Sequence, residues 1–322
     1  MPGLAGGEVD LRLHPTDEQQ GVLAASLGPI RIAAGAGTGK TTTVAMLVHH
    51  LATTRGIEPE AVLGITFTNK AAAELADRIR ALLAPDLGPG REAEVHTYHG
   101  FAAQVVAEFG ALVGIERGAS VITPTFARQL LFEVVRHRDF DHLDVTWEGS
   151  VEKVQRMGAA LGDHLADPDI VARAATDEDP WPERLELLAA WQDYQDHKRR
   201  LGVVDYADLI SATVRLLALH PDIAQRIRNR YRVVLLDEYQ DTNPAQRVLL
   251  QHLFGDGFPL VAVGDTDQTI YEWRGATPAN FESFPLQFPR PDGTPAQQHA
   301  LTLNRRSDRL ILDVANLIRA QI

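Results

Sequence analysis

The chain of 322 residues contains no cysteine, so disulfide bonds, thiolate zinc sites and iron–sulfur clusters cannot form from its own side chains. It also lacks any apolar run that approaches the roughly 18 residues of a membrane-spanning helix. Residues 1–10 show neither the basic nor the apolar region of a signal peptide. These absences predict a cytoplasmic protein that has no membrane partner.

Basic residues are scarce as well. The 31 lysines and arginines stand against 43 aspartates and glutamates, which gives a formal net charge of −12. This balance argues against tight, non-specific binding of duplex nucleic acid, which usually depends on a basic surface. It leaves a local binding groove open, because a groove depends on nearby charges and not on their sum. The length predicts two domains at about 150 residues each.

The motif around which the chain is organised is a phosphate-binding loop between an apolar run at 30–34 and a helical segment. Its small residues let backbone N–H groups close around phosphate oxygens, Lys40 reaches the outer phosphates, and the Thr41 hydroxyl can ligate Mg²⁺. Ala34 stands where the pattern opens with glycine, which requires a negative φ there. The alternative is a chance glycine-rich turn. The predicted nucleotide contacts of the loop are Ala34, Gly35, Ala36, Gly37, Thr38, Gly39, Lys40 and Thr41.

A second apolar segment, at 233–236, ends in the carboxylates Asp237 and Glu238. Downstream of a phosphate loop, one such carboxylate holds magnesium and another orients or deprotonates the attacking water. Adjacent strand residues point to opposite faces, so these two side chains can take different roles. We therefore predict Asp237 as a magnesium ligand with Thr41, and Glu238 as catalytic. The alternative is a strand followed by an acidic loop.

Short apolar segments at 30–34, 61–67, 232–236 and 260–263 alternate with segments of helical spacing. This alternation predicts a parallel α/β sheet of the phosphate-loop class, in which ligands lie beyond the carboxyl ends of the strands. Between 111 and 203 helical spacing dominates, which predicts an inserted all-helical unit.

One basic run lies near the end of that unit, at His197-Lys198-Arg199-Arg200. We interpret it as the last turn of a helix, where cations complement the helix dipole and Gly202 ends the helix.

A series of segments, in order along nearly the whole chain, resembles the motifs of the UvrD/Rep family of superfamily 1 DNA helicases. Together these motifs are highly specific. Besides the phosphate loop, the segments are Thr16-Asp17-Glu18-Gln19 (the adenine-reading Q motif), 65–74 (motif Ia), Thr97-Tyr98-His99-Gly100, 204–209, 237–243 (motif II), 263–276 (motif III) and 303–307 (motif IV).

The resemblance implies a RecA-like fold and a division into domains. Residues 1–110 and 204–297 would form the ATP-binding core, 111–203 an inserted helical domain, and 298–322 the start of a second RecA-like domain. It implies an enzyme that uses ATP and Mg²⁺ to move 3′ to 5′ on single-stranded DNA at 3′ tails or duplex junctions. Repair or recombination would be its setting, with repair or nuclease proteins as candidate partners.

The resemblance also implies roles for single residues. Gln268 would sense the γ-phosphate, Arg306 would be the arginine finger, and Gln19 would pair with adenine. Two positions depart from the family: Thr42 stands where arginine is frequent, and Arg305 where tyrosine is usual. The guanidinium plane of Arg305 can stack on a base in place of the tyrosine ring. Taken alone, Gln19 and Arg306 would be ordinary surface residues.

For DNA, aromatic rings offer stacking platforms and polar side chains reach backbone phosphates. The alternative for each ring is packing in the core. The predicted DNA contacts are Phe67, Asn69, Lys70, Thr97, His99, Tyr271, Trp273 and Arg274.

Nothing in the sequence resembles the family's motifs V and VI, so we expect the chain to hold the N-terminal part of such an enzyme. Two alternatives stay open beside the helicase: a fragment that binds nucleotide and single-stranded DNA without unwinding, and the helicase part of a helicase–nuclease. A phosphate-loop ATPase unrelated to helicases is a third, against which Gln19 and the aromatic motif III argue.

Overall fold

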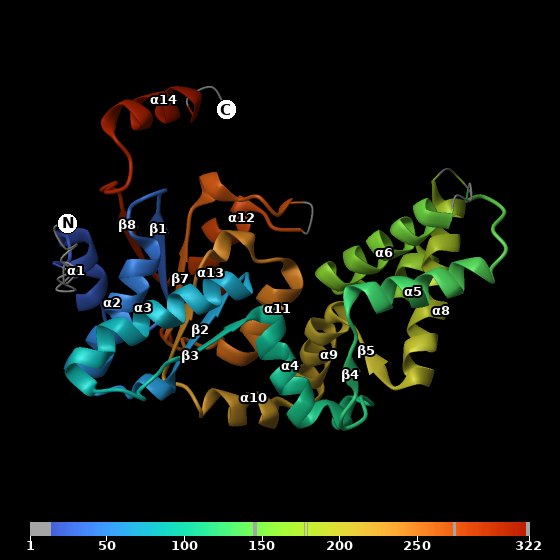
Figure 1. The fold of residues 1–322 in the computed structure, drawn as a ribbon, viewed down its shortest axis with the longest axis horizontal. Helices are drawn as coiled ribbons and strands as arrows, with labels where there is room; N and C mark the ends of the chain where they lie inside the picture. The colour runs from blue at the N-terminus through green and yellow to red at the C-terminus, as the bar shows by residue number, and fades with distance from the viewer. Residues whose placement is uncertain (1–13, 144–146, 177, 179, 273–274, 320–322) are drawn as a thin grey trace, which may run out of the picture.

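The computed structural model describes residues 14–319 except 144–146, 177, 179 and 273–274. A six-stranded parallel sheet has helices on both faces, and a helical unit projects to one side (Figure 1). The predicted α/β parallel sheet is therefore confirmed. In spatial order the strands are β3 (Glu94–Thr97), β2 (Val62–Thr66), β6 (Val233–Leu236), β7 (Leu260–Gly264), β1 (Ile30–Ala34) and β8 (Gln297–Leu301).

Successive residues of the central strands enter different cores on the two sides of the sheet. In β6, Val233 and Leu235 pack on one side, and Val234 and Leu236 pack on the other. Burial on both faces explains why these strands are continuous apolar runs. One face is covered by α1 (Asp17–Ala24), α2 (Lys40–Arg55) and α3 (Asn69–Leu87), and the other by α4 (Tyr98–Phe109), α9 (Tyr206–Leu219), α10 (Pro221–Arg228), α11 (Pro244–Phe254), α12 (Pro278–Glu282) and α13 (Phe284–Gln287).

Local signals in the sequence explain several helix ends. Thr16 and Gln19 form a capping box at the start of α1. Pro85 lies inside α3, which continues to Leu87 and is ended by Gly88. The buried face of α3, which includes Leu83, keeps the last turn in place despite the proline. Short 3-10 turns lie at η1 (Pro59–Ala61), η2 (Gly110–Val113), η3 (Tyr239–Asp241) and η4 (Thr266–Gln268).

The edge strand β8 was not predicted from the sequence. It is only partly buried, with the sequence Gln-Gln-His-Ala-Leu, and it pairs in parallel with β1. An edge strand that is open to solvent carries no continuous apolar run, which is why the pattern missed it. The sequence assigned residues 298–322 to a second domain, whereas the structure places 298–301 in the first sheet. Beyond that sheet lies α14 (Arg309–Arg319).

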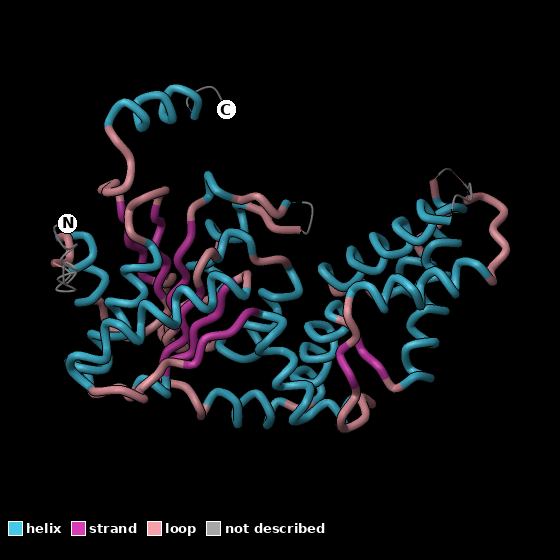
Figure 2. Tube along the Cα trace, in the orientation of Figure 1, coloured by secondary structure: helices cyan, strands magenta, loops and turns pink. Residues whose placement is uncertain are grey.

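The projecting unit contains the segment predicted as a helical insertion, and Figure 2 shows it as mainly helical. It has its own apolar core, and the pair of two-residue strands β4 (Ser120–Val121) and β5 (Val203–Val204) departs from an all-helical unit. Among the described residues no helix is both long and apolar enough to cross a bilayer. The helices of this unit are α5 (Pro124–Arg136), α6 (Trp147–His164), α7 (Pro168–Arg173) and α8 (Trp181–Leu201).

A buried ionic cluster joins α8 to α9, where the insertion returns to the core. Lys198 is 1% exposed, and its Nζ lies 2.7 Å from Oδ2 of both Asp205 and Asp208. The Tyr194 hydroxyl also donates to Asp205, at 2.8 Å. Asp205 is the N-cap of α9, so the cluster fixes the start of that helix on α8. The basic run does form the last turn of α8, which Gly202 ends, as the sequence predicted; the buried ionic cluster of Lys198 is an additional role that the sequence did not indicate.

Candidate nucleotide and DNA site

The phosphate loop connects β1 to α2. Gly37 and Gly39 have φ of 73° and 90°, which L side chains adopt rarely, so glycine is required at both positions. Ala34 ends β1 with a negative φ, as its side chain demands. The Thr38 hydroxyl donates to the Gly35 carbonyl at 2.8 Å and closes the turn. The loop thus has the shape that the sequence predicted.

Lys40, the first residue of α2, is 9% exposed and points toward the carboxyl end of β6. Its Nζ lies 3.2 Å from Oε2 of Glu238. Within the described part of the chain this buried nitrogen makes no hydrogen bond. A buried ammonium group with unused donors is suited to an anionic ligand such as a phosphate.

Two carboxylates follow β6. Asp237 is 3% exposed, and burial, together with the neighbouring charge of Glu238, raises the pKa of its carboxyl from 3.8 to about 6, against the opposing effects of Lys40 and the Thr41 hydroxyl. Glu238 has a left-handed backbone, with φ 52° and ψ 44°. Such a conformation is unfavourable for a residue with a side chain and is found most often at functional sites.

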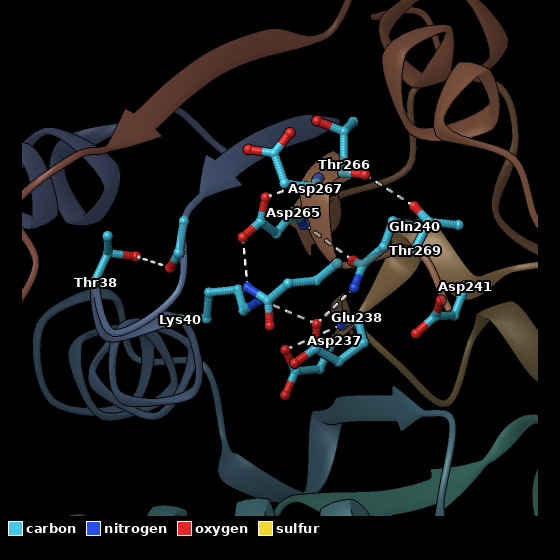
Figure 3. A network of polar contacts seen from close by, with 12 residues as sticks. Thr38, Lys40, Asp237, Glu238, Gln240, Asp241, Asp265, Thr266, Asp267 and Thr269 are labelled. Atoms are coloured by element: carbon cyan, nitrogen blue, oxygen red, sulfur yellow. Dashed lines mark hydrogen bonds and ion pairs between the residues drawn. The ribbon is translucent and has the colours of Figure 1, made fainter. Parts of the chain in front are cut away.

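The loop after β7 brings a third group to this edge. Asp265 caps the η4 turn, and its Oδ2 accepts a hydrogen bond of 2.5 Å from Nε2 of Gln268. Gln240 of η3 bridges to Glu238 and to the backbone of Asp265 (Figure 3). The ends of β1, β6 and β7 therefore form one connected polar network.

The turn after β8 is attached directly to the phosphate loop. The Asn304 amide donates to the Ala36 carbonyl at 2.6 Å, and the Arg305 backbone N–H donates to the Gly37 carbonyl at 2.9 Å. The Arg306 N–H in turn donates to the Asn304 side chain at 2.9 Å. The sequence placed Arg306 in a second domain, with nothing rigid to hold it, whereas the structure holds its backbone against the first.

The phosphate loop, Glu238, Gln268 and the turn after β8 surround one cavity of about 350 Å³. Its three arginines, Arg78, Arg305 and Arg306, have no carboxylate within ion-pair distance among the described residues. Unpaired guanidinium groups around a cavity of an acidic protein favour an anionic ligand. The cavity is lined by Gln19, Arg78, Glu238, Gln268, Arg305, Arg306 and the loop residues 35–42.

Arg78 is a residue that sequence reasoning missed. It lies on α3, and its Nη1 donates to the Thr42 hydroxyl at 3.1 Å. It therefore brings a guanidinium group to the position where Thr42 lacks one. Its contact depends on how α3 packs beside α2, which no local pattern shows.

Gln19 is only 3% exposed, and its amide is already partly engaged. Its Oε1 accepts from the Thr16 N–H at 3.0 Å, and its Nε2 donates to the Thr43 hydroxyl at 2.9 Å. One N–H and one lone pair are left for a base, so pairing with adenine needs no rearrangement of the capping box.

The predicted DNA contacts follow the carboxyl ends of β2, β3 and β7. The half-buried rings of Phe67 and Tyr271 lie with their centroids 4.3 Å apart, at an interplanar angle of 33°. Asn69 and Lys70 begin α3 and are exposed. Trp273 and Arg274, which were also predicted to bind DNA, lie outside the described residues.

Thr97 and His99 lie where β3 meets α4. The Thr97 hydroxyl caps α4 by accepting from the Gly100 N–H at 3.0 Å. The rings of His99 and Tyr206 meet edge-on, with their centroids 6.1 Å apart. Tyr206 is 52% exposed. Sequence reasoning did not single out Tyr206, although an exposed ring at the N-terminus of α9 is a candidate stacking platform. His99 and Tyr206 line a cavity of about 470 Å³ between the insertion and the core.

The comparisons with known proteins agree with this geometry. The model of the UvrD/REP helicase N-terminal domain matches residues 15–289. The chain belongs to the UvrD/REP helicase family. The ATP-dependent DNA helicase PcrA of Staphylococcus aureus (strain Mu50 / ATCC 700699) is 32% identical over 309 residues, which cover 94% of this chain and 39% of that protein.

A second member of the UvrD/REP helicase family gives the same picture. The ATP-dependent DNA helicase UvrD1 of Mycobacterium tuberculosis (strain CDC 1551 / Oshkosh) is 36% identical over 317 residues, or 96% of this chain and 39% of that protein. The chain thus spans about two fifths of the length of these relatives. The resemblance indicated by the sequence motifs is confirmed.

Proposed function

We propose that this chain is the ATP-hydrolysing part of a DNA helicase that couples ATP turnover to movement along single-stranded DNA. The observation that carries the proposal is the cavity of about 350 Å³ that brings the phosphate loop, Glu238, Gln268 and Arg306 together. The names of the relatives, which are ATP-dependent DNA helicases, support it.

The residues present fit magnesium. The Thr41 hydroxyl and the Asp237 carboxylate interact, and both offer the hard oxygen donors that Mg²⁺ prefers. We propose that Thr41 and Asp237 hold the ion together with phosphate oxygens of ATP. When bound, Mg²⁺ would neutralise charge on the phosphates.

The side chains of the cavity divide the remaining chemistry. Lys40 would bind the outer phosphates, since its buried Nζ has unused donors. Glu238 would orient the attacking water and accept its proton, while Gln268 senses the γ-phosphate. Arg306 would stabilise the charge on the transferred phosphoryl group. Gln19 would read the base, and Arg305 would stack on it.

For DNA, we propose a path over the carboxyl ends of β2, β3 and β7, with 3′ to 5′ movement as in the family. Phe67, Tyr271 and Tyr206 would stack on bases, and Asn69, Lys70, Thr97 and His99 would contact phosphates. The sequence adds Trp273 and Arg274 to these contacts. We also propose that the protein acts in DNA repair or recombination in the cytoplasm, together with repair or nuclease proteins.

A second candidate is a module that binds nucleotide and single-stranded DNA without unwinding. It is favoured by the single RecA-like sheet of the described residues, because unwinding needs two lobes that open and close around the nucleotide. For each candidate we propose the same domains: residues 14–110 and 204–301 form the core, 111–203 form the insertion, and α14 begins the second RecA-like domain. A helicase part of a helicase–nuclease is the third candidate.

A single set of assays tests these candidates. We expect the 322-residue chain to bind ATP weakly and to hydrolyse it slowly in the presence of single-stranded DNA, without strand displacement. Glu238→Gln should retain nucleotide binding and lose turnover, because it removes the proton acceptor and keeps the shape. Turnover near that of the wild type in this variant would reject Glu238 as the water-orienting group. Robust strand displacement would reject the binding-module candidate.

A further inference from the structure

Gln240 is buried at the centre of the polar network, between two strand ends. It is 1% exposed, and its Nε2 donates to Oε2 of Glu238 at 2.8 Å. Its Oε1 accepts from the backbone N–H of Asp265 at 3.0 Å (Figure 3). The Gln240 amide therefore connects Glu238 to Asp265, the first residue of the loop that carries Gln268.

The contact to Glu238 matters because little else fixes that carboxylate. Its Oε2 also lies 3.2 Å from Lys40 Nζ. A phosphate ligand would draw the ammonium group of Lys40 away, and Gln240 would then be the remaining donor to Oε2 among the described residues. No donor in that part of the chain reaches Oε1, which is left to accept a hydrogen bond from water.

The backbone around Gln240 is built to admit this amide. A Cβ atom on Gly264 would lie 2.6 Å from Gln240 Oε1 and 3.1 Å from the Phe281 ring. The last residue of β7 must therefore be glycine if Gln240 is to reach Asp265. The backbone of Glu238, which is left-handed with φ 52°, is held by other groups: its N–H donates to Asp237 Oδ1 at 3.1 Å and its carbonyl accepts from the Asp241 N–H at 3.0 Å.

We infer that Gln240 is a positioning residue for ATP hydrolysis, one that orients the Glu238 carboxylate and fixes it relative to the loop of Gln268. The inference rests on the proposed function. Gln240 itself would contact neither the phosphate nor the attacking water. It binds Oε2 of Glu238, so that Oε1 faces the attacking water, and it ties that geometry to the position of Gln268.

The test compares two buried glutamines of the same segment. Gln240→Leu removes both hydrogen bonds, and we expect kcat for DNA-stimulated ATP turnover to fall about 10- to 100-fold, as for loss of a hydrogen bond to a charged group. Nucleotide affinity should stay within about threefold, because no phosphate contact is lost. The control is Gln246→Leu: Gln246 is also 1% exposed but only completes the capping box of α11.

Two further variants separate orientation from folding. Gln240→Asn keeps a buried amide but is one methylene too short to reach both Glu238 and Asp265, so kcat should fall toward that of Gln240→Leu while the melting temperature stays closer to that of the wild type. Adding Gln240→Leu to Glu238→Gln should cause no further loss, since the residue acts through Glu238.

The outcomes distinguish the inference from the proposed function. A wild-type chain that shows no ATP turnover with DNA would overturn the proposed function. Turnover in the wild type with equal kcat losses in Gln240→Leu and Gln246→Leu would overturn the inference alone. A full additional loss in the double variant would do so as well.

Discussion

Two buried lysines, in two regions of the molecule, show how differently a protein can treat the same side chain. Lys198, at the joint of insertion and core, lies 2.7 Å from each of two aspartates. Lys40, at the edge of the sheet, is nearly as buried, yet its nitrogen makes no hydrogen bond with a described residue. Burial alone therefore does not mark a functional site; what distinguishes Lys40 is that its unused donors lie at the phosphate-loop cavity.

The same contrast holds for the surrounding charges. At the joint, each charged group of the cluster has a partner, and the cluster caps a helix. At the sheet edge, Arg305 and Arg306 have no carboxylate within ion-pair distance among the described residues. The joint is complete without a ligand, and the edge is not.

The largest effect is expected at the turn that carries the predicted arginine finger. Arg306→Ala should lower ATP turnover about 10³- to 10⁵-fold and leave the melting temperature unchanged, because this guanidinium group has no ion-pair partner among the described residues. Asn304→Ala should give part of that loss, since Asn304 ties the turn to the Ala36 carbonyl. Single-turnover ATPase assays and thermal melts measure both. A fall in stability with normal turnover in Arg306→Ala would contradict the comparison.

The two lysines themselves give the direct test. Lys198→Met should cost about 3–5 kcal/mol of unfolding free energy, because it leaves two buried carboxylates without their cation. Lys40→Met should lower turnover by about 10²- to 10³-fold, as for loss of one charged donor to a phosphoryl group, with little loss of stability. Chemical denaturation measures the loss of stability in both variants, and ATPase assays measure the loss of turnover. Equal losses of stability would remove the distinction.

The sequence predicted the phosphate loop and the carboxylates at the sheet edge, but not the ionic cluster around Lys198. The strand at 233–236 is fully buried and the strand at 30–34 is mostly so. Such apolar runs, alternating with helical segments, indicated a parallel sheet with carboxylates at its edge. The pattern missed β8 because an open edge strand can be polar. It also missed the structural role of Lys198, since nothing local distinguishes a buried cation from an exposed one.

Contacts between distant elements were the hardest to foresee. Arg78 reaches Thr42 from another helix, and Gln240 meets Asp265 across 25 residues of sequence. Such contacts depend on how helices and strands pack together, which residue propensity and sequence spacing do not predict.

A smaller effect is expected where the insertion meets the predicted DNA path. Tyr206→Ala should weaken binding of single-stranded DNA by about 1–3 kcal/mol, similarly across sequences, through loss of one stacking surface. Because the ring is 52% exposed, the melting temperature should change little. Fluorescence anisotropy with labelled oligonucleotides measures the affinity. Unchanged affinity would remove Tyr206 from the path.

The smallest effect concerns pH. Burial and the charge of Glu238 raise the pKa of Asp241 from 3.8 to about 6, although the Ile270 N–H and Lys40 oppose the shift. A raised folded-state pKa means that this group costs stability above about pH 6 and ceases to do so as the pH falls toward 4. Asp241→Asn should therefore be about 1–2 kcal/mol more stable than the wild type at pH 8.

The difference between Asp241→Asn and the wild type should shrink as the pH falls below 6, and denaturation curves from pH 8 to pH 5 would show it. At the joint the sign is opposite for Asp205: burial raises its pKa, but Lys198 and the other hydrogen bonds outweigh burial and lower it. A constant difference between variant and wild type across this range would contradict the raised pKa of Asp241.

The left-handed backbone of Glu238 has a consequence for how such a protein can be altered. For a residue with a side chain, this conformation costs roughly 1–2 kcal/mol, and glycine would adopt it without that cost. A variant with glycine at position 238 would give up the chemistry and release the strain. At this position the fold can therefore gain stability only by losing the carboxylate, so selection for heat resistance alone would favour an inactive form here.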